Sequence, residues 1–428
     1  VGFTSAANIE DVIATNQYAN RRVDSEKYNN IGIENRNILR YKFGKLNQNL
    51  AFGVRLYQAK TERFQKGKGT TGSDFDLSIE GKYPTSLEFT TKNSAFFAEN
   101  QFKLSNQFSI TPGIRFEHIN STAKGRIDIV SGNNITIENQ TITRNKPLFG
   151  IGLEYKWMKT NFYANISQAF RPVLFSDITP SAVIDVIDPN LKDASGFNAD
   201  IGYRGVYNGY INFDVSVFYL SYNNRVGGIR QFINNDPTQG TYLFRTNLGE
   251  TRNKGIESFI DLNITKMVGI DKPYGNLDVF ASMSFIDSKY VDFITTSSSG
   301  SAPNIVISET NLSGNRVENA PRYIHNFGMS WGNNNFSATV QYKMSGRIFT
   351  DANNSITPSA NGQTGELDAY RIVDFSSEYK FLKHYNIRGG VNNVMDKSYA
   401  TRRSGGYPGP GILPGEVRTF YISIGAKF

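Results

Sequence analysis

The stretch RTFYISIGAKF, Arg418–Phe428, alternates between apolar and polar residues up to a final aromatic residue. Phe420, Ile422 and Ile424 share one side of an extended chain with the final Phe428, because successive side chains of a strand point to opposite faces. The intervening positions carry Thr, Tyr, Ser, Gly and Lys. One apolar face and one polar face are typical of a strand that borders lipid, so this stretch predicts the closing strand of a transmembrane β-barrel.

The composition permits a barrel and excludes helical membrane spans. Hydrophobic residues make up 39% of the 428 residues and the mean hydropathy is −0.40. No run approaches the roughly 20 apolar residues that a spanning helix needs. A barrel strand faces lipid only at every second residue, so it escapes such averages. Aromatic residues, at 13%, and 39 glycines would supply aromatic girdles and close strand contacts.

The charge balance favours anionic partners. The formal net charge is +8, yet the basic residues are scattered rather than clustered on a compact module, which argues against nucleic acid as a partner. Cysteine is absent, so neither a disulfide framework nor a thiol site is expected.

Alternation with a period of two recurs in about fifteen segments along the chain. Leu50, Phe52 and Val54 alternate with small or polar residues, and Phe213 and Val215 do the same in a later segment. Short turns are predicted at Gly44–Asn47, Ser105–Gln107, Met158–Thr160, Asn208–Gly209, Asn333–Asn335 and Leu382–Tyr385. Long loops are predicted at Gln65–Glu88, Ala123–Asn145, Pro172–Asp193, Ile294–Asn315, Asp351–Leu367 and Thr401–Pro414.

Short turns on one side and long loops on the other are typical of an outer-membrane barrel. The predicted strands, of about 12–17 residues, exceed the roughly 10 that cross a bilayer and would project beyond it. Because bacterial barrels close with an even number of strands, about fifteen strands predict an incomplete barrel in this chain. Residues 1–26 read as the tail of one more strand followed by a loop.

Several motifs, in this order, carry a resemblance to a known family. They are YNNIGIENR (Tyr28–Arg36), SQAFRPVLFSDI (Ser167–Ile178), RNKGIESFIDL (Arg252–Leu262), ENAPRYIHNFGMSW (Glu318–Trp331), VNNVMDKSYATRR (Val391–Arg403) and YPGPGILPGEVRTFYISIGAKF (Tyr407–Phe428). With these, the chain resembles the carboxyl-terminal part of a TonB-dependent outer-membrane receptor, of the ferric dicitrate (siderophore) type.

The resemblance implies an all-β, transmembrane antiparallel β-barrel of about 22 strands, plugged by an amino-terminal domain. Residues 1–428 would supply about 15 of these strands, from about the eighth to the last, with the plug and the first strands missing. It implies energised import of a ferric chelate, most simply iron(III) dicitrate, in the outer membrane of a Gram-negative bacterium. The implied partners are that chelate, the TonB complex through the missing part, and outer-membrane lipid and lipopolysaccharide.

Candidate ligand residues follow from the chemistry of dicitrate, whose carboxylates suit Arg guanidinium groups. Arg63 precedes a predicted long loop, Arg21 and Arg22 lie in the opening loop, and Arg403 begins the last loop. The resemblance implies that Arg residues near these strands hold citrate and that Phe428 is read by the barrel-assembly machinery. For each Arg, solvated surface or lipopolysaccharide contact is the alternative interpretation.

Enzymatic activity is not expected, and neither is a cofactor or a metal site. The three histidines, His118, His325 and His384, are isolated, and no nucleophile motif is present. Alternative functions are a TonB-dependent receptor for another siderophore, cobalamin or an oligosaccharide, and a passive porin.

Overall fold

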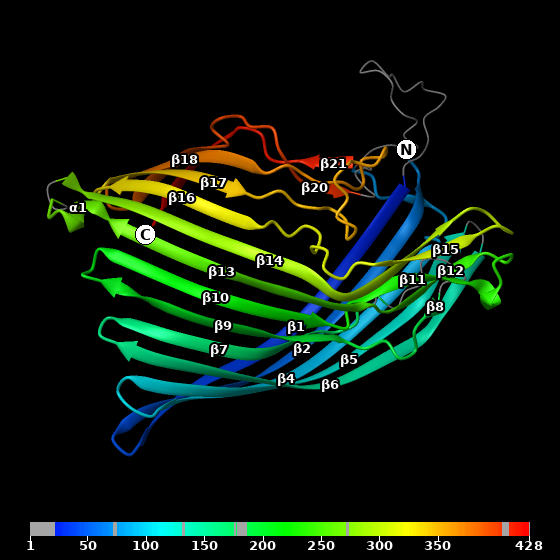
Figure 1. The fold of residues 1–428 in the computed structure, drawn as a ribbon, viewed down its shortest axis with the longest axis horizontal. Helices are drawn as coiled ribbons and strands as arrows, with labels where there is room; N and C mark the ends of the chain where they lie inside the picture. Colours follow the sequence, from blue (N-terminus) through cyan, green and yellow to red (C-terminus); the bar gives the residue numbers. More distant parts are fainter. Residues whose placement is uncertain are drawn as a thin grey trace.

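One large antiparallel sheet dominates the computed structural model, which describes residues 22–71, 75–130, 133–174, 177, 186–270, 274–404 and 411–427. Figure 1 shows the sheet curving around a central space. Within these ranges it contains seventeen strands, of which β3 (Ile79–Glu80) and β15 (Val306–Asn311) are short additions near long loops, leaving fifteen main strands. The prediction of an all-β barrel sheet with about fifteen strands is confirmed.

The main strands follow the chain order, each antiparallel to the next. They are β1 (Arg22–Phe43), β2 (Leu46–Gly69), β4 (Thr85–Lys103), β5 (Phe108–Val130), β6 (Asn133–Trp157), β7 (Thr160–Arg171), β9 (Ala194–Tyr207), β10 (Ile211–Asn223), β13 (Gly249–Asn263), β14 (Asn276–Ser299), β16 (Tyr323–Gly332), β17 (Phe336–Ser345), β18 (Tyr370–Phe381), β19 (Tyr385–Asn392) and β22 (Thr419–Ala426).

The remaining elements decorate the long connections. They are β8 (Val186–Ile187), β11 (Val226–Phe232), the 3₁₀ turn η2 (Ile233–Asn235), β12 (Thr241–Asn247), β20 (Ala400–Ser404) and β21 (Gly411–Pro414). The single-turn helix α1 (Ile264–Met267) lies instead in the connection between β13 and β14, on the short-turn side. No helix within the described ranges is long and apolar enough to span a membrane.

The sheet has two open edges in the described part of the chain. β1 pairs with β2 alone, and β22 pairs with β19 alone. The fifteen strands therefore do not close on themselves, as expected for an incomplete barrel. An open edge leaves backbone N–H and C=O groups unpaired, which is very costly in lipid.

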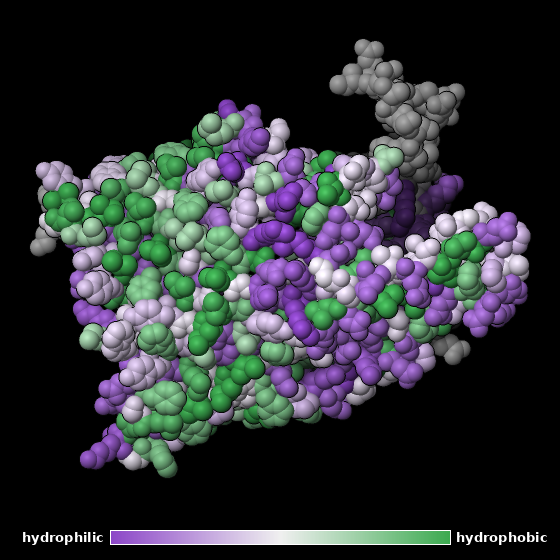
Figure 2. All heavy atoms as spheres, viewed as in Figure 1, coloured by the Kyte–Doolittle hydropathy of each residue, from purple (hydrophilic) through white to green (hydrophobic). Residues whose placement is uncertain are grey.

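The strand register shows which residues of the other strands share a face with the apolar residues of the last strand. We define the outer face by the row of paired residues Phe420, Val391, Phe375, Val340, Met329, Val279 and Leu262. Most large apolar side chains exposed on the strands share this face, among them Phe96, Phe149 and Ile201. On the face drawn in Figure 2, hydrophobic residues gather toward the short-turn end and hydrophilic residues toward the long loops. Such an apolar band facing outward is what lipid requires.

The predicted short turns are confirmed, but three predicted long loops were too long. β2 continues to Gly69, and the predicted loop Ala123–Asn145 is mostly the paired ends of β5 and β6. Within the predicted loop Ile294–Asn315, β14 continues to Ser299 and pairs with β15. The five strands from β1 to β6 span 19–25 residues, beyond the predicted range. Past the apolar band their outward positions become polar, so the hydrophobic alternation stops while the hydrogen-bonded ladder goes on.

Candidate ligand-binding site

Arg63 lies on the inner face of β2, opposite Leu87 of β4 and Glu26 of β1. Its Nε donates to Glu26 Oε1 at 2.5 Å, and its guanidinium lies 5.7 Å from the ring centre of Phe89. The hydroxyl of Tyr28 also donates to Glu26. This hydrogen bond and the Arg63 ion pair lower the pKa of Glu26 below its ordinary value. Arg63 thus faces the interior, as a ligand residue should, but it is already paired with Glu26.

The other candidates do not gather around Arg63. Arg22 forms an ion pair with Asp24 of its own strand at 2.7 Å. Arg403 donates to the backbone carbonyls of Gly362, Gly365 and Glu366, so it fastens the β17–β18 connection to the β19–β22 connection. Arg21 and Phe428 fall outside the described residues. Ligand contact by the Arg residues and the assembly role of Phe428 stay predictions.

A denser group of cations lies where β6 and β7 leave the membrane band. Arg144 and Lys146 project from the inner face of β6, in register with Ile119 and Glu117 of β5. Both bind the carboxylate of Asp193, which precedes β9: Lys146 Nζ lies 3.0 Å from Oδ2, and Arg144 Nε donates to Oδ1. Together with Lys192, they line a cavity of about 380 Å³. We call this cavity the β6 basic pocket.

Asp193 is the buried anchor of the β6 basic pocket. Burial alone raises its pKa, but the backbone N–H of Val173 at 3.0 Å and the two cations outweigh burial and hold the pKa below its ordinary value. The carboxylate is therefore ionised near neutral pH and keeps Arg144 and Lys146 in place. Lys192 has no ion pair with any described residue, so its charge is available to a ligand.

A second buried junction, made of three side chains, lies beside the β10–β11 connection. Arg225, between β10 and β11, contacts Glu318 Oε1 at 2.5 Å and lies 5.4 Å from the ring centre of Tyr290. The hydroxyl of Tyr290 donates to Glu318. Burial raises the pKa of Glu318, but the Tyr290 hydrogen bond and Arg225 bring it below the ordinary value. The junction thereby joins the β10–β11 and β15–β16 connections to strand β14.

The described residues contain no cluster of His, Cys, Asp or Glu that could hold a metal ion. The sequence alone does not reveal the β6 basic pocket, because Asn145 and Asp193 lie at the edges of two predicted loops. The alternation in TITRNKPLFGIGL, from Thr141 to Leu153, could have extended β6 and placed Arg144 and Lys146 on the inner face.

Known proteins share this architecture. The sequence model described as TonB dependent receptor-like, beta-barrel matches residues 2–394. The ferrienterobactin receptor of Escherichia coli (strain K12) is 22% identical over 407 residues, which cover 90% of this chain and 49% of that protein. The ferric citrate transporter FecA in its unliganded form superposes with a TM-score of 0.70 and 21% identity, covering 95% of this chain and 55% of that one. The siderophore receptor PiuA from Acinetobacter baumannii gives a TM-score of 0.70, 13% identity and coverage of 95% and 56%.

The chain spans about half the length of the relatives that it matches. Those relatives are receptors and a transporter, which agrees with the prediction that the chain is not an enzyme. By the match of the family model over residues 2–394, this chain belongs to the TonB-dependent receptor-like β-barrel family, whose barrels reside in the outer membrane of Gram-negative bacteria.

Proposed function

We propose that the receptor containing this chain imports a ferric chelate across the outer membrane, and that an anionic carboxylate chelate such as iron(III) dicitrate is its substrate. The observation that carries the proposal is the β6 basic pocket, where Arg144, Lys146 and Lys192 outnumber the single carboxylate of Asp193. Arg144 and Lys146 are held on strand β6, so they can attract carboxylates without a large cost of ordering, and Lys192 lies just before β9.

The geometry favours a polyanion over a neutral ligand. Arg171, at the end of β7, lies on the same inner face and is paired with Asp177 at 3.0 Å. The pocket lies on the long-loop side, because Lys192 and Asp193 belong to the long connection between β7 and β9, where a ligand from outside would arrive first. A bulky anionic chelate would contact Lys192, which has no ion pair with a described residue, while Arg144 and Lys146 stay bound to Asp193 and add to the local positive charge.

Other substrates remain alternatives within this function. The relatives are named for different ligands, ferrienterobactin and ferric citrate among them. Another siderophore that carries negative charge would suit the same cations, whereas cobalamin or a neutral oligosaccharide would not need them.

The proposal includes parts beyond this chain. The two open edges, β1 and β22, call for further strands to complete the barrel. We propose that the full receptor also contains a plug and a segment that binds the TonB complex, as the family membership suggests.

The test is uptake of radiolabelled iron citrate by iron-starved cells that express the full-length receptor. We expect Lys146→Gln with Lys192→Gln to lower uptake at limiting chelate about tenfold or more, since two charge contacts are lost. Lys92→Gln, which removes an exposed charge from the outer face of β4, is the matched control and should leave uptake unchanged. Arg63→Ala tests the earlier candidate in the same assay.

Energy coupling separates import from passive diffusion. Uptake should vanish in cells that lack the TonB complex. Uptake that persists there would support the porin alternative, and uptake of other ferric chelates but not citrate would change the substrate while keeping the receptor class.

A further inference from the structure

Asn247, the last residue of β12, reaches across to the connection that builds the β6 basic pocket. Its side-chain oxygen accepts the backbone N–H of Lys192 at 2.8 Å. Its side-chain nitrogen donates to the carbonyl of Lys192 at 3.0 Å and to that of Asn224 at 2.8 Å. Lys192 and Asn224 both line the β6 basic pocket, although they belong to different connections. One side-chain amide therefore holds two parts of the pocket wall together.

The two bonds to Lys192 imitate strand pairing. A neighbouring strand would offer one acceptor and one donor to a residue, and the side-chain amide of Asn247 offers the same two groups. We call this arrangement, in which one side-chain amide binds the N–H and the C=O of one residue, an amide clamp. Lys192 lies in no strand, and the described residues give its two backbone groups no other hydrogen-bond partner. The clamp thus fixes the backbone from which the Lys192 side chain extends.

Asn247 is itself held firmly. Its backbone pairs with Val226 of β11, and the N–H of the next residue, Leu248, donates to the carbonyl of Arg225 at 2.7 Å. Arg225 belongs to the buried junction with Glu318. A positioning residue must be supported in this way, because a mobile support would leave its partner mobile.

The neighbouring anchor of the pocket does not depend on the clamp. The carboxylate of Asp193 is held by the backbone N–H of Val173 and by the two cations of β6. Lys192 has no such contacts through its side chain within the described structure. Lys192 is therefore the pocket cation whose placement rests on Asn247.

We propose that Asn247 is a positioning residue for the binding of the ferric chelate. It holds Lys192 so that the ammonium group of Lys192 adds its charge to Arg144 and Lys146 when an anion enters the β6 basic pocket. A cation on an ordered backbone binds an anion more tightly than one that must be ordered during binding. The inference rests on the proposed function, because it concerns the same pocket and the same anionic ligand.

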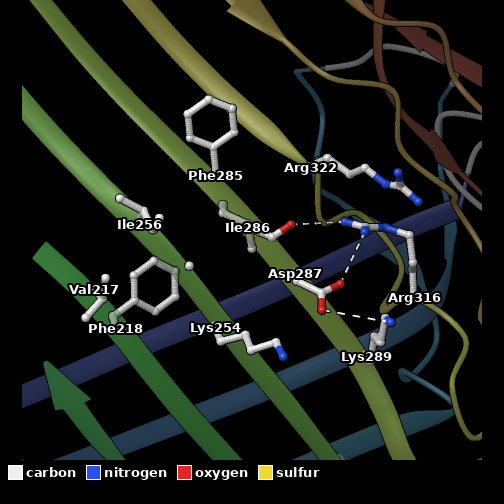
Figure 3. A pocket seen from close by; sticks show the side chains of 11 residues that line it. Val217, Phe218, Lys254, Ile256, Phe285, Ile286, Asp287, Lys289, Arg316 and Arg322 are labelled. Atoms are coloured by element: carbon white, nitrogen blue, oxygen red, sulfur yellow. Dashed lines mark hydrogen bonds and ion pairs between the residues drawn. The ribbon is translucent and has the colours of Figure 1, made fainter.

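A second amide clamp in the chain supplies a matched control. Asn354 accepts the backbone N–H of Arg316 and donates to its carbonyl, both at 2.8 Å. The side chain of Arg316 extends to β14, where it donates to the Ile286 carbonyl and lies 3.6 Å from Asp287 (Figure 3). This clamp also joins two connections, but none of these residues lines the β6 basic pocket.

Equilibrium binding of radiolabelled iron(III) citrate to the purified full-length receptor tests the proposal through a double-mutant cycle. We expect Lys192→Gln to weaken binding about fivefold and Asn247→Ala about threefold. Because Asn247 acts through Lys192, the double variant should stay near fivefold, whereas independent effects would multiply to about fifteenfold. Asn354→Gly should bind as the parent does. Gly is used there because the φ of Asn354 is 58°, where Ala would add strain.

Two further measurements separate positioning from a general loss of structure. Hydrogen exchange of the ligand-free receptor should be faster at the amide of residue 192 in Asn247→Ala. In cells, Asn247→Ala should raise the chelate concentration for half-maximal uptake and leave the maximal uptake per receptor unchanged. Heat-dependent migration in gels verifies that each variant is folded.

The outcomes distinguish this inference from the proposed function. A further threefold loss when Asn247→Ala is added to Lys192→Gln would overturn the positioning role. Unchanged exchange at residue 192 in Asn247→Ala, or equal weakening by Asn354→Gly, would do the same. Parent-like binding by Lys192→Gln, or a parent receptor that does not bind iron(III) citrate, would instead overturn the proposed function, and the inference with it.

Discussion

The two ends of the sheet build the wall above the membrane in different ways. β1, β2, β5 and β6 have 22–25 residues, whereas β16, β17, β19 and β22 have 8–10. All of these strands reach the short-turn end of the sheet, and each needs about 10 residues to cross the bilayer. The first group continues outward as a paired sheet, and the second continues as loops. Above the membrane, one side of the barrel wall is therefore a hydrogen-bonded sheet, the ladder side, and the other consists of connections held by side-chain contacts, the loop side.

The difference determines how stability is distributed. On the ladder side, outer-face charges alternate, with Glu88 between Lys60 at 3.0 Å and Lys124 at 3.1 Å, and each exposed pair contributes about 0–1 kcal/mol. On the loop side, a few buried side chains hold long stretches of backbone. Single substitutions should therefore affect the loops more than the ladder.

Asn393 should give the largest effect, because it is 1% exposed and holds the β19–β22 connection. Its side chain donates to the carbonyls of Lys397 and Glu416 and accepts from the Lys397 N–H. We expect Asn393→Ala to destabilise this connection by about 2–3 kcal/mol, since buried backbone groups lose their partners. Hydrogen exchange of the full-length receptor measures this destabilisation. Unchanged protection of residues 393–404 would show that the loop side does not depend on single buried side chains more than the ladder side does.

Arg403 should rank second. Arg403→Ala removes three hydrogen bonds to backbone carbonyls, and we expect about 1–2 kcal/mol because the side chain is half-buried. Increased protease cleavage within 355–366 measures the loss. Arg403→Lys, which keeps the charge but not the three-way geometry, should restore little of the protection. Full restoration by Lys would mean that charge rather than geometry holds the loops.

Acid should loosen the Arg225–Glu318–Tyr290 junction to a smaller degree. The folded pKa of Glu318 lies below its ordinary value of 4.5, so its contribution is complete above that pH and is lost as the pH falls through the folded pKa. Hydrogen exchange near residues 315–322 should increase over this acid range in the parent. Glu318→Gln should show the loosened state already at neutral pH, with little further change on acidification.

Glu88→Gln should have the smallest effect. It removes both ion pairs of the outer-face charges, yet the backbone ladder remains, so we expect less than about 1 kcal/mol. The loss should shrink further in high salt, because exposed charges are screened. A loss as large as that of Asn393→Ala would show that the ladder side also depends on single contacts.

The sequence predicted the parts of the fold that lipid dictates. Apolar side chains at every second position, as in Phe420, Ile422 and Ile424, established the strands, and polar turns marked one end of the barrel. Beyond the bilayer this signal disappears, so the ends of β5 and β6 were assigned to a loop.

The candidate site was harder to predict because it depends on register. Arg63 was recognised from its type and place, but Glu26, 37 residues away, becomes its partner only through the pairing of β1 with β2. Lys146 and Asp193 meet across two connections in the same way. Composition identifies cations, whereas only the fold shows which of them are already neutralised.

The pairing of Arg63 with Glu26 has a consequence for any ligand that approaches it. An anion at Arg63 must displace a carboxylate tethered to the neighbouring strand, whose effective concentration is of millimolar order or higher. A dilute chelate would lose that contest, while at Lys192 it meets no internal rival within the described structure. The interior thus divides its cations into an occupied set that maintains shape and a vacant set that can capture cargo.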